Sequence, residues 1–250
     1  IKYGQNYISQ LTPKIFFKYA PGHMRDIRGS DGYRLTYDKL FDLNKSPEID
    51  VIDTGLSTSL GLNYELKEIT NNNNLGQTKF SLEVGQSFNE KYNFDMPNKT
   101  SLNRKVSDLV GSATYNFNSN SDIKLNFNLD ENYSDLKYSE LNTNFNNNNF
   151  KFSVSYIEER DYIGKSNYLS TGLSYNFNES SNISFSAKRN FETDSAEFYN
   201  LSYEYINDCL KAGLVFRREF YTDRDLEQED VLMFNITFRP FDTVNSPKFR

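Results

Sequence analysis

The sequence predicts an all-β fold, namely an antiparallel transmembrane β-barrel segment of about twelve strands. Two patterns predict it: apolar and polar residues alternate along extended runs, and the connections between these runs alternate between short and long. The composition agrees, because Phe and Tyr make up 16% of the chain. Disordered segments are poor in aromatic residues, so the mean hydropathy of −0.72 does not indicate disorder.

Alternation is clearest at 55–67, where the even positions from Leu56 to Leu66 are mostly apolar and the odd positions from Gly55 to Lys67 are small or polar. Neighbouring side chains of a strand point to opposite faces, so this pattern predicts one apolar face and one polar, solvated face. The runs predicted as strands are 12–20, 55–67, 78–88, 108–118, 122–130, 136–146, 150–156, 168–178, 182–191, 197–205, 209–220 and 230–239.

The run 136–146 changes phase near Ser139 and Glu140, which predicts a β-bulge. Many runs approach the ~9–11 residues that a tilted strand needs to cross a bilayer. No stretch has helical periodicity, and none holds the ~18 consecutive apolar residues of a membrane helix. The polar faces are rich in Ser, Asn, Lys, Glu and Gly, which favours a water-filled lumen over the dry interior of a soluble β-sandwich.

Short and long connections alternate along the chain, as they do in outer-membrane barrels with short periplasmic turns and longer outer loops. The pattern predicts that 1–250 is part of a larger β-barrel domain in a Gram-negative outer membrane, with a long outer loop at 21–53, a tail at 240–250 and a periplasmic C-terminus. Tight turns are predicted at 118–121, 146–149, 178–181 and 207–208, with a polar link at 70–76. Longer connections are predicted at 21–53, 89–105, 131–135, 158–166, 190–196 and 221–229.

Several function classes find no support in the sequence. A net charge of −6 gives no reason to expect nucleic acid as the main partner. His23 is the only histidine and falls in a predicted loop, so no histidine-based triad with a spare metal-ligand cluster can be assembled. No glycine-rich phosphate-binding motif occurs. We expect no catalytic residue, no metal, no cofactor and no enzymatic activity.

Five segments carry a resemblance to a known family, in matching order and with matching separations. The chain resembles the C-terminal half of the barrel of the LPS-assembly outer-membrane protein (LptD) family. It departs from the family at Asp50-Val51, where the family tends to carry Gly-x-Asp-Arg, and at Cys209-Leu210, where it tends to carry two adjacent cysteines. The segments are 11–21, Leu40-Phe41 with Asn44, 55–62, 203–210 and 221–227.

The resemblance implies a very large barrel whose first and last strands meet at a weak seam, through which lipopolysaccharide (LPS) leaves for the outer leaflet. It implies four partners: LPS itself, an LptE-like lipoprotein that plugs the lumen, a periplasmic LPS-transport bridge and the barrel-insertion machinery. The bridge would act through an N-terminal periplasmic domain that, like the first half of the barrel, lies outside this chain.

Cys209 has two interpretations. The resemblance implies a disulfide from Cys209 to a cysteine of the missing N-terminal region, in an oxidising compartment where disulfides persist. The alternative is a small, inert residue at the start of a strand. Asn207 and Asp208 before it are turn formers.

Lysines near the starts of outward-going strands point to the predicted polar face, which suggests an electrostatic collar at the periplasmic mouth. Ammonium groups attract phosphate without demanding strict geometry, so the collar would attract the lipid A phosphates. The alternative is a set of solvated lysines that snorkel at the membrane edge. The candidate residues are Lys14, Lys79, Lys124, Lys151 and Lys211.

The last predicted strand places Leu232, Phe234, Ile236 and Phe238 on one face. The resemblance implies that this strand carries the insertion signal and forms one side of the seam, whereas the plainer interpretation is an ordinary lipid-facing strand. The charged hairpin around it, with Arg217, Arg218 and 219–229, either binds LPS phosphates or holds internal ion pairs in a solvated loop.

Three functions compete at this point. The first is an LPS translocon that assembles LPS into the outer leaflet, the second is a general porin or passive channel, and the third is a soluble β-sandwich adhesin. The first is the principal expectation because it takes in both the alternating pattern and the family resemblance.

Overall fold

The computed structural model describes residues 2–3, 7–30, 34–69, 75–160, 165–220, 229–238 and 242–245. Over these residues the chain forms twelve long strands, two short strands and two 3-10 turns. The strands are β1 (Lys2–Tyr3), β2 (Tyr7–Ala20), β3 (Gly55–Ile69), β4 (Leu75–Asn89), β5 (Leu109–Asn118), β6 (Ser121–Leu129), β7 (Leu136–Asn147), β8 (Phe150–Glu159), β9 (Ser166–Asn178), β10 (Ser181–Asn190), β11 (Ser195–Ile206), β12 (Leu210–Glu219), β13 (Glu229–Phe238) and β14 (Asp242–Asn245). The 3-10 turns are η1 (Asp38–Phe41) and η2 (Asn98–Thr100).

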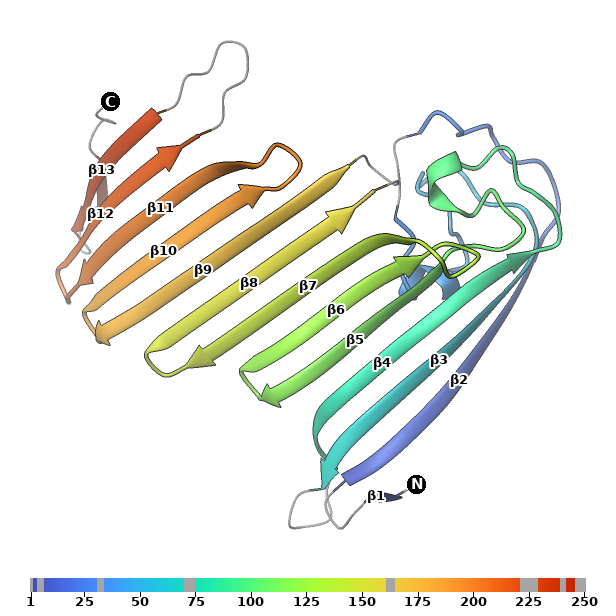
Figure 1. Cartoon of the computed structure of the whole chain (residues 1–250), viewed down its shortest axis with the longest axis horizontal. Coiled ribbons are helices and arrows are strands. Elements are labelled where there is room, and N and C mark those ends of the chain that lie inside the picture. Colours follow the sequence, from blue (N-terminus) through green and yellow to red (C-terminus); the bar gives the residue numbers. More distant parts are fainter. Residues whose placement is uncertain are drawn as a thin grey trace. The chain divides into compact units, whose positions relative to one another are not determined.

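Strand pairing follows chain order (Figure 1). The chain divides into two compact units, Ile1–Leu141 with Ile157–Ser166 and Asn142–Tyr156 with Asn167–Arg250. Within the first unit β1 to β6 pair as antiparallel neighbours. Within the second, β9 to β14 do the same. The prediction of an all-antiparallel sheet protein is confirmed.

All twelve predicted strands are present, because each alternating run overlaps one of β2 to β13 over most of its length. The largest boundary difference is at β2, which begins at Tyr7 rather than at the predicted residue 12. The tail expected at 240–250 contains the short strand β14, which pairs with 235–238 of β13. Such pairing satisfies backbone groups that a bare strand edge would leave open. Strand β13 is therefore not the last strand of the chain.

The phase change in β7 coincides with a buried aromatic residue on the polar face, and the predicted bulge stays a prediction. Tyr138 is 1% exposed, and its hydroxyl donates to Glu140 at 2.7 Å. Glu140 also accepts from Asn126 of the polar face of β6. Tyr138 is thus an aromatic residue on the polar face, and the apolar pattern breaks because this ring packs against a loop.

One face of each unit carries exposed apolar side chains. Phe17 and Tyr19 of β2 are 72% and 73% exposed, and the register sets Tyr19 beside Leu56 and Ile15 beside Leu60. Soluble monomers rarely show apolar patches that run across several strands, so this face is the predicted hydrophobic belt. In the second unit its members include Leu173, Tyr175, Phe177, Phe185, Tyr199, Leu201, Tyr203, Tyr205, Leu214, Phe216, Leu232, Phe234 and Phe238.

The opposite face of the first unit is covered, in part, by the chain's own connections. The segments 21–54 and 90–108 lie side by side at one end of β2 to β4 (Figure 1), joined where the Ile27 amide donates to Asp95 at 2.9 Å. Their apolar residues form the buried core of the described residues. The core comprises Met24, Ile27, Leu35, Tyr37, Leu40, Val51, Met96 and Leu102, with Val110 of β5 beneath them. The expected wet face is therefore partly filled by a packed loop.

Two glycines let this loop approach the sheet. Gly61 and Gly85 are cross-strand partners on the polar face of β3 and β4. A Cβ on Gly61 would lie 2.5 Å from Cζ of Phe41, and a Cβ on Gly85 would lie 2.8 Å from Cδ1 of Leu40. Any larger residue would push the η1 turn away from the strands.

We expect Gly61→Ala to loosen segment 34–54, because the added methyl overlaps the Phe41 ring. Hydrogen–deuterium exchange should show faster exchange of the Lys45 and Val51 amides in this variant. Gly29→Ala is the matched control, since a Cβ there meets no atom within 4 Å. Equal exchange in the two variants would contradict the packing described here.

Candidate functional site

The loop segment 21–54 is fastened to the polar face by a buried ion pair. Lys18 of β2 contacts Asp53, and their side chains are only 8% and 12% exposed. The same carboxylate accepts the backbone N–H of Lys45 at 2.8 Å. Asn44 closes the base of the loop, because its Nδ2 donates to the Val51 carbonyl at 2.9 Å. Asp53, at the end of the loop, therefore links strand β2 to the loop backbone at Lys45.

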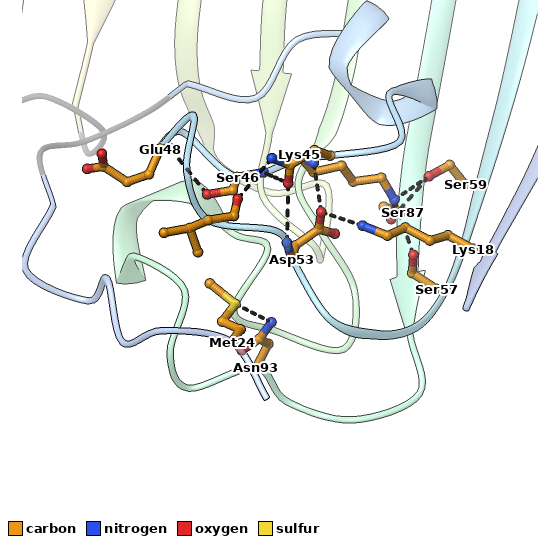
Figure 2. A network of polar contacts seen from close by, with 12 residues as sticks. Lys18, Met24, Lys45, Ser46, Glu48, Asp53, Ser57, Ser59, Ser87 and Asn93 are labelled. Atoms are coloured by element: carbon orange, nitrogen blue, oxygen red, sulfur yellow. Dashed lines mark hydrogen bonds and ion pairs between the residues drawn. The ribbon is translucent and has the colours of Figure 1, made fainter. Parts of the chain in front are cut away.

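A second fastening is made by Lys45, whose side chain reaches into a group of serines (Figure 2). Its Nζ lies 2.9 Å from Oγ of Ser59, 3.0 Å from Oγ of Ser87 and 3.4 Å from Oγ of Ser57. These serines belong to the polar faces of β3 and β4. The ammonium also stands 5.9 Å from the centre of the Phe16 ring. Lys45 thus inserts a charge where the sequence pattern leaves small hydroxyl side chains.

Burial lowers the pKa of the Lys45 ammonium to about 8. The carboxylate of Asp53 opposes this shift, and the neighbouring ammonium of Lys18 adds to it. The charged form is disfavoured because it has lost water and gained three hydroxyls and no carboxylate of its own.

A polar cavity of ≈ 210 Å³ lies beside the docked loop. Loop residues Arg34, Tyr37 and Asp38 form one side, and Glu83, Lys124 and Tyr138 of the strands are among those forming the other. The guanidinium carbon of Arg34 stands 3.7 Å from the centre of the Tyr138 ring, a cation–π contact. The cavity therefore combines aromatic faces with both signs of charge.

The second connection, 90–108, is held to the strands by buried polar contacts. Lys137 lies 3.0 Å from Asp108, whose side chain is 0% exposed. Gln86, at an outward position of β4, is buried because its amide donates to the Ser107 carbonyl at 2.9 Å and accepts from the Tyr133 hydroxyl at 2.9 Å. These contacts attach the connection to the strand ends of the first unit.

The five predicted collar lysines do not behave alike. Lys14 lies in the middle of β2 rather than near its start, because that strand begins earlier than predicted. Its Nζ stands 5.1 Å from the centre of the Tyr37 ring. Lys79 donates to the Phe117 carbonyl at 3.0 Å, and Lys211 pairs with Glu204 at 2.7 Å.

Lys124 and Lys151 have no ion pair among the described residues. Lys124 lines the cavity, and Lys151 is the second residue of β8. The first unit holds Lys14, Lys79 and Lys124, and the second holds Lys151 and Lys211.

Cys209 is exposed and carries a free thiol. It sits in a tight turn, in which the Asn207 carboxamide accepts the amides of Cys209 at 3.0 Å and Leu210 at 2.7 Å. The structure therefore gives no support to a disulfide at this position.

The residues expected in the last strand lie on the apolar face of β13. Leu232, Phe234 and Phe238 are about half exposed, and the register sets Ile236 beside Ala212. In the flanking hairpin Arg218 pairs with Asp230 at 2.6 Å and Arg217 with Glu219 at 2.6 Å. The interpretation of these charges as internal ion pairs is thus supported, while 221–228 falls outside the described residues.

Sequence reasoning missed Lys18, Lys45, Asp53, Arg34 and Tyr138 as a group. One signal was available, because Lys18 occupies the same polar face of β2 as Lys14. The partners of Lys18 lie in an aperiodic loop, and nothing in a single sequence says which strand such a loop will contact.

Asp53→Asn should release segment 21–54 from the strands, because it leaves the Lys18 charge buried and unpaired. Removing one member of a buried ion pair costs roughly 3–5 kcal/mol, which should appear as lost amide protection across 40–53. Asp50→Asn is the control, since Asp50 pairs with Arg25 in an exposed position. Exposed pairs contribute under about 1 kcal/mol. Intact protection in Asp53→Asn would contradict the fastening.

Docking of the loop should become more stable as pH rises from about 8 to 10.5. Docked Lys45 titrates near 8 and an ordinary lysine near 10.5, so the undocked state binds more protons in that window. Amide exchange corrected for its intrinsic pH dependence measures this. Lys45→Met should stay docked and lose the effect, and a rise that persists in Lys45→Met would assign it to another group.

Among the described residues, none of the helical segments is long and apolar enough to cross a membrane. The same residues contain no group of three or more His, Cys, Asp or Glu side chains that could hold a metal ion.

Comparisons with known proteins place the chain in a family. No curated protein matches it. Solved structures that resemble it include a triple mutant of the Rhodopseudomonas blastica porin and one described as "Asymmetric conductivity of engineered proteins". Each is 11% identical, with a TM-score of 0.34, over 95% of this chain and 97% of the other. The family model for LptD, LPS transport system D, matches residues 1–170. Because this match covers more than half of the chain, the protein belongs to the LptD family.

Proposed function

We propose that this chain forms part of the barrel wall through which LPS reaches the outer leaflet of the outer membrane, and that it does so without catalysing a reaction. The observation that carries the proposal is a two-faced antiparallel sheet in an LptD-family chain. One face presents exposed apolar side chains, and the other presents hydroxyls, amides and charges. A lipid with a large saccharide needs such a pair of environments.

The apolar face supports a membrane location. In a bilayer every backbone polar group must be paired within the protein, and antiparallel strands with neighbours on both sides meet that need. Phe, Tyr and Leu on the outward positions contact acyl chains without cost. The polar face supports a wet interior, because Ser184 and Ser202, for example, share a 2.6 Å hydrogen bond there in the second unit.

The docked segment 21–54 narrows the polar side of the first unit in this proposal. Its core and its two lysine fastenings hold it against β2 to β5. A loop held in this position would keep small solutes from passing along the polar side of the first unit, while the larger barrel transports LPS. Transport would use the space that the loop leaves open.

The partners belong to the proposal as well. An LptE-like lipoprotein in the lumen, a periplasmic bridge reached through an N-terminal domain and the barrel-insertion machinery are those that the family resemblance suggests. Support for the last is the apolar face of β13, with Leu232, Phe234 and Phe238 exposed. Support for a disulfide is limited to the exposure of the Cys209 thiol. With Cys209 at a tight turn, we infer a periplasmic side for that turn and for the C-terminus.

Depletion of the full-length protein should lower the delivery of newly made LPS to the cell surface. The measurement is pulse-labelled LPS that becomes accessible to a surface-modifying enzyme. If LPS delivery is unchanged, and if outer membranes from the depleted cells lose ion conductance when they are fused to planar bilayers, the protein is a passive channel and not a translocon.

The lysine collar is a second, separable part of the proposal. Lys151→Glu combined with Lys211→Glu should slow LPS delivery several-fold, because two charges near strand starts then repel the lipid A phosphates instead of attracting them. Lys188→Glu is the matched control, since Lys188 lies near the opposite end of its strand and pairs with Glu197. Normal LPS delivery in the double variant would reject the collar and leave the translocon standing.

A further inference from the structure

We propose that the cavity beside the docked loop is a binding site for one neutral, polyhydroxylated sugar ring. The cavity lies in the first unit between the loop residues Arg34 to Asp38 and the polar faces of β4 to β7. Its role in transport rests on the function proposed above, whereas sugar binding itself does not.

The size of the cavity limits the ligand. A volume of ≈ 210 Å³ is below the ~300–1,000 Å³ of sites that hold drug-sized molecules. One six-membered ring with its hydroxyls fits that space better than a disaccharide or an acyl chain. The Tyr37 ring, which lines the cavity, supplies flat apolar surface for the C–H face of a sugar, whereas the Tyr138 ring beside it is covered by the Arg34 guanidinium.

Two cations in the wall have hydrogen-bond donors that no carboxylate of the described residues uses. The Arg34 guanidinium stacks on Tyr138, and no carboxylate of the described residues pairs with it. Stacking fixes the plane of the guanidinium, so its N–H groups point along that plane. The ammonium of Lys124 is likewise unpaired within the described part of the chain.

Acceptors stand in the same wall. Asp38 forms no ion pair within the described ranges, and Glu83 receives a single donor on Oε1, the Asn63 amide at 3.2 Å. One N–H of the Asn126 amide is committed to Glu140 at 2.9 Å, so Asn126 offers a ligand its carbonyl oxygen and its second N–H.

The balance of these groups selects the ligand class. Two basic side chains, Arg34 and Lys124, and two carboxyl side chains, Asp38 and Glu83, line the cavity. A phosphate would meet both carboxyl groups, and an acyl chain would strip water from four ionisable side chains with no hydrogen bond in return. Hydroxyl groups donate and accept, so a neutral sugar satisfies both kinds of wall group.

The test is saturation-transfer NMR on the full-length protein in a detergent without a sugar headgroup. Methyl hexoside should give a saturable signal, and hexose phosphate should give a weaker one. Ser112→Phe, which fills the cavity, should abolish the signal. Asn126→Ala should weaken binding several-fold. This variant adds no bulk to the cavity, so it distinguishes loss of binding from a folding defect caused by the larger side chain of Ser112→Phe. Ser153→Phe, on the polar side of β8 in the second unit, should leave binding unchanged.

Failure takes distinct forms in this experiment. No saturable signal in the wild type, an unchanged signal in Ser112→Phe, or stronger binding of the phosphate would each overturn the sugar site. A photoreactive residue at Thr36, which also lines the cavity, decides the source of the ring. A crosslink to LPS in cells would assign it to a glycolipid, and hexoside binding without that crosslink would overturn the role in transport alone. Failure of the proposed translocon function is detected by a separate measurement, which is LPS delivery in depleted cells.

Discussion

The strict alternation of side chains across a β-strand is the constraint on which this structure depends. Every long strand must place half of its side chains on each face, and the sequence fills one half with Leu, Phe and Tyr and the other with Ser, Asn and Lys. The apolar half stays exposed on the described strands, as it does in barrels whose outer face contacts lipid. The polar half then becomes available for the loop, the lysines and the cavity.

The loop segment 21–54 uses two kinds of interaction on that polar face. Leu40 and Phe41 pack where Gly61 and Gly85 leave room, and Lys45 meets serine hydroxyls farther along the same strands. The ion pair of Lys18 with Asp53 ties the end of the loop to β2. Apolar packing contributes favourable free energy to docking, whereas the buried polar contacts select one position, since any shift would leave charges without partners.

The strands were predictable because their signal is local. A period of two over about ten residues identifies a strand whatever surrounds it, and all twelve alternating runs appear as β2 to β13. The predictions were wrong at positions whose structure is determined by tertiary contacts. Tyr138 breaks the pattern because Arg34 covers it, and Lys14 lies mid-strand because β2 extends to Tyr7 through pairing with β3. Neither partner is near in sequence, so neither could be read from a short window.

The paired glycines at Gly61 and Gly85 have a consequence for assembly. Side chains that lie opposite one another on neighbouring strands normally make contacts that stabilise the sheet. The Gly61–Gly85 pair of the first unit has no side chains and makes no such contact. The η1 turn supplies it instead through Leu40 and Phe41. In a newly made chain, β3 and β4 would therefore be weakly packed at these glycines until the η1 turn docks. We expect this part of the two strands and the η1 turn to fold in one cooperative step.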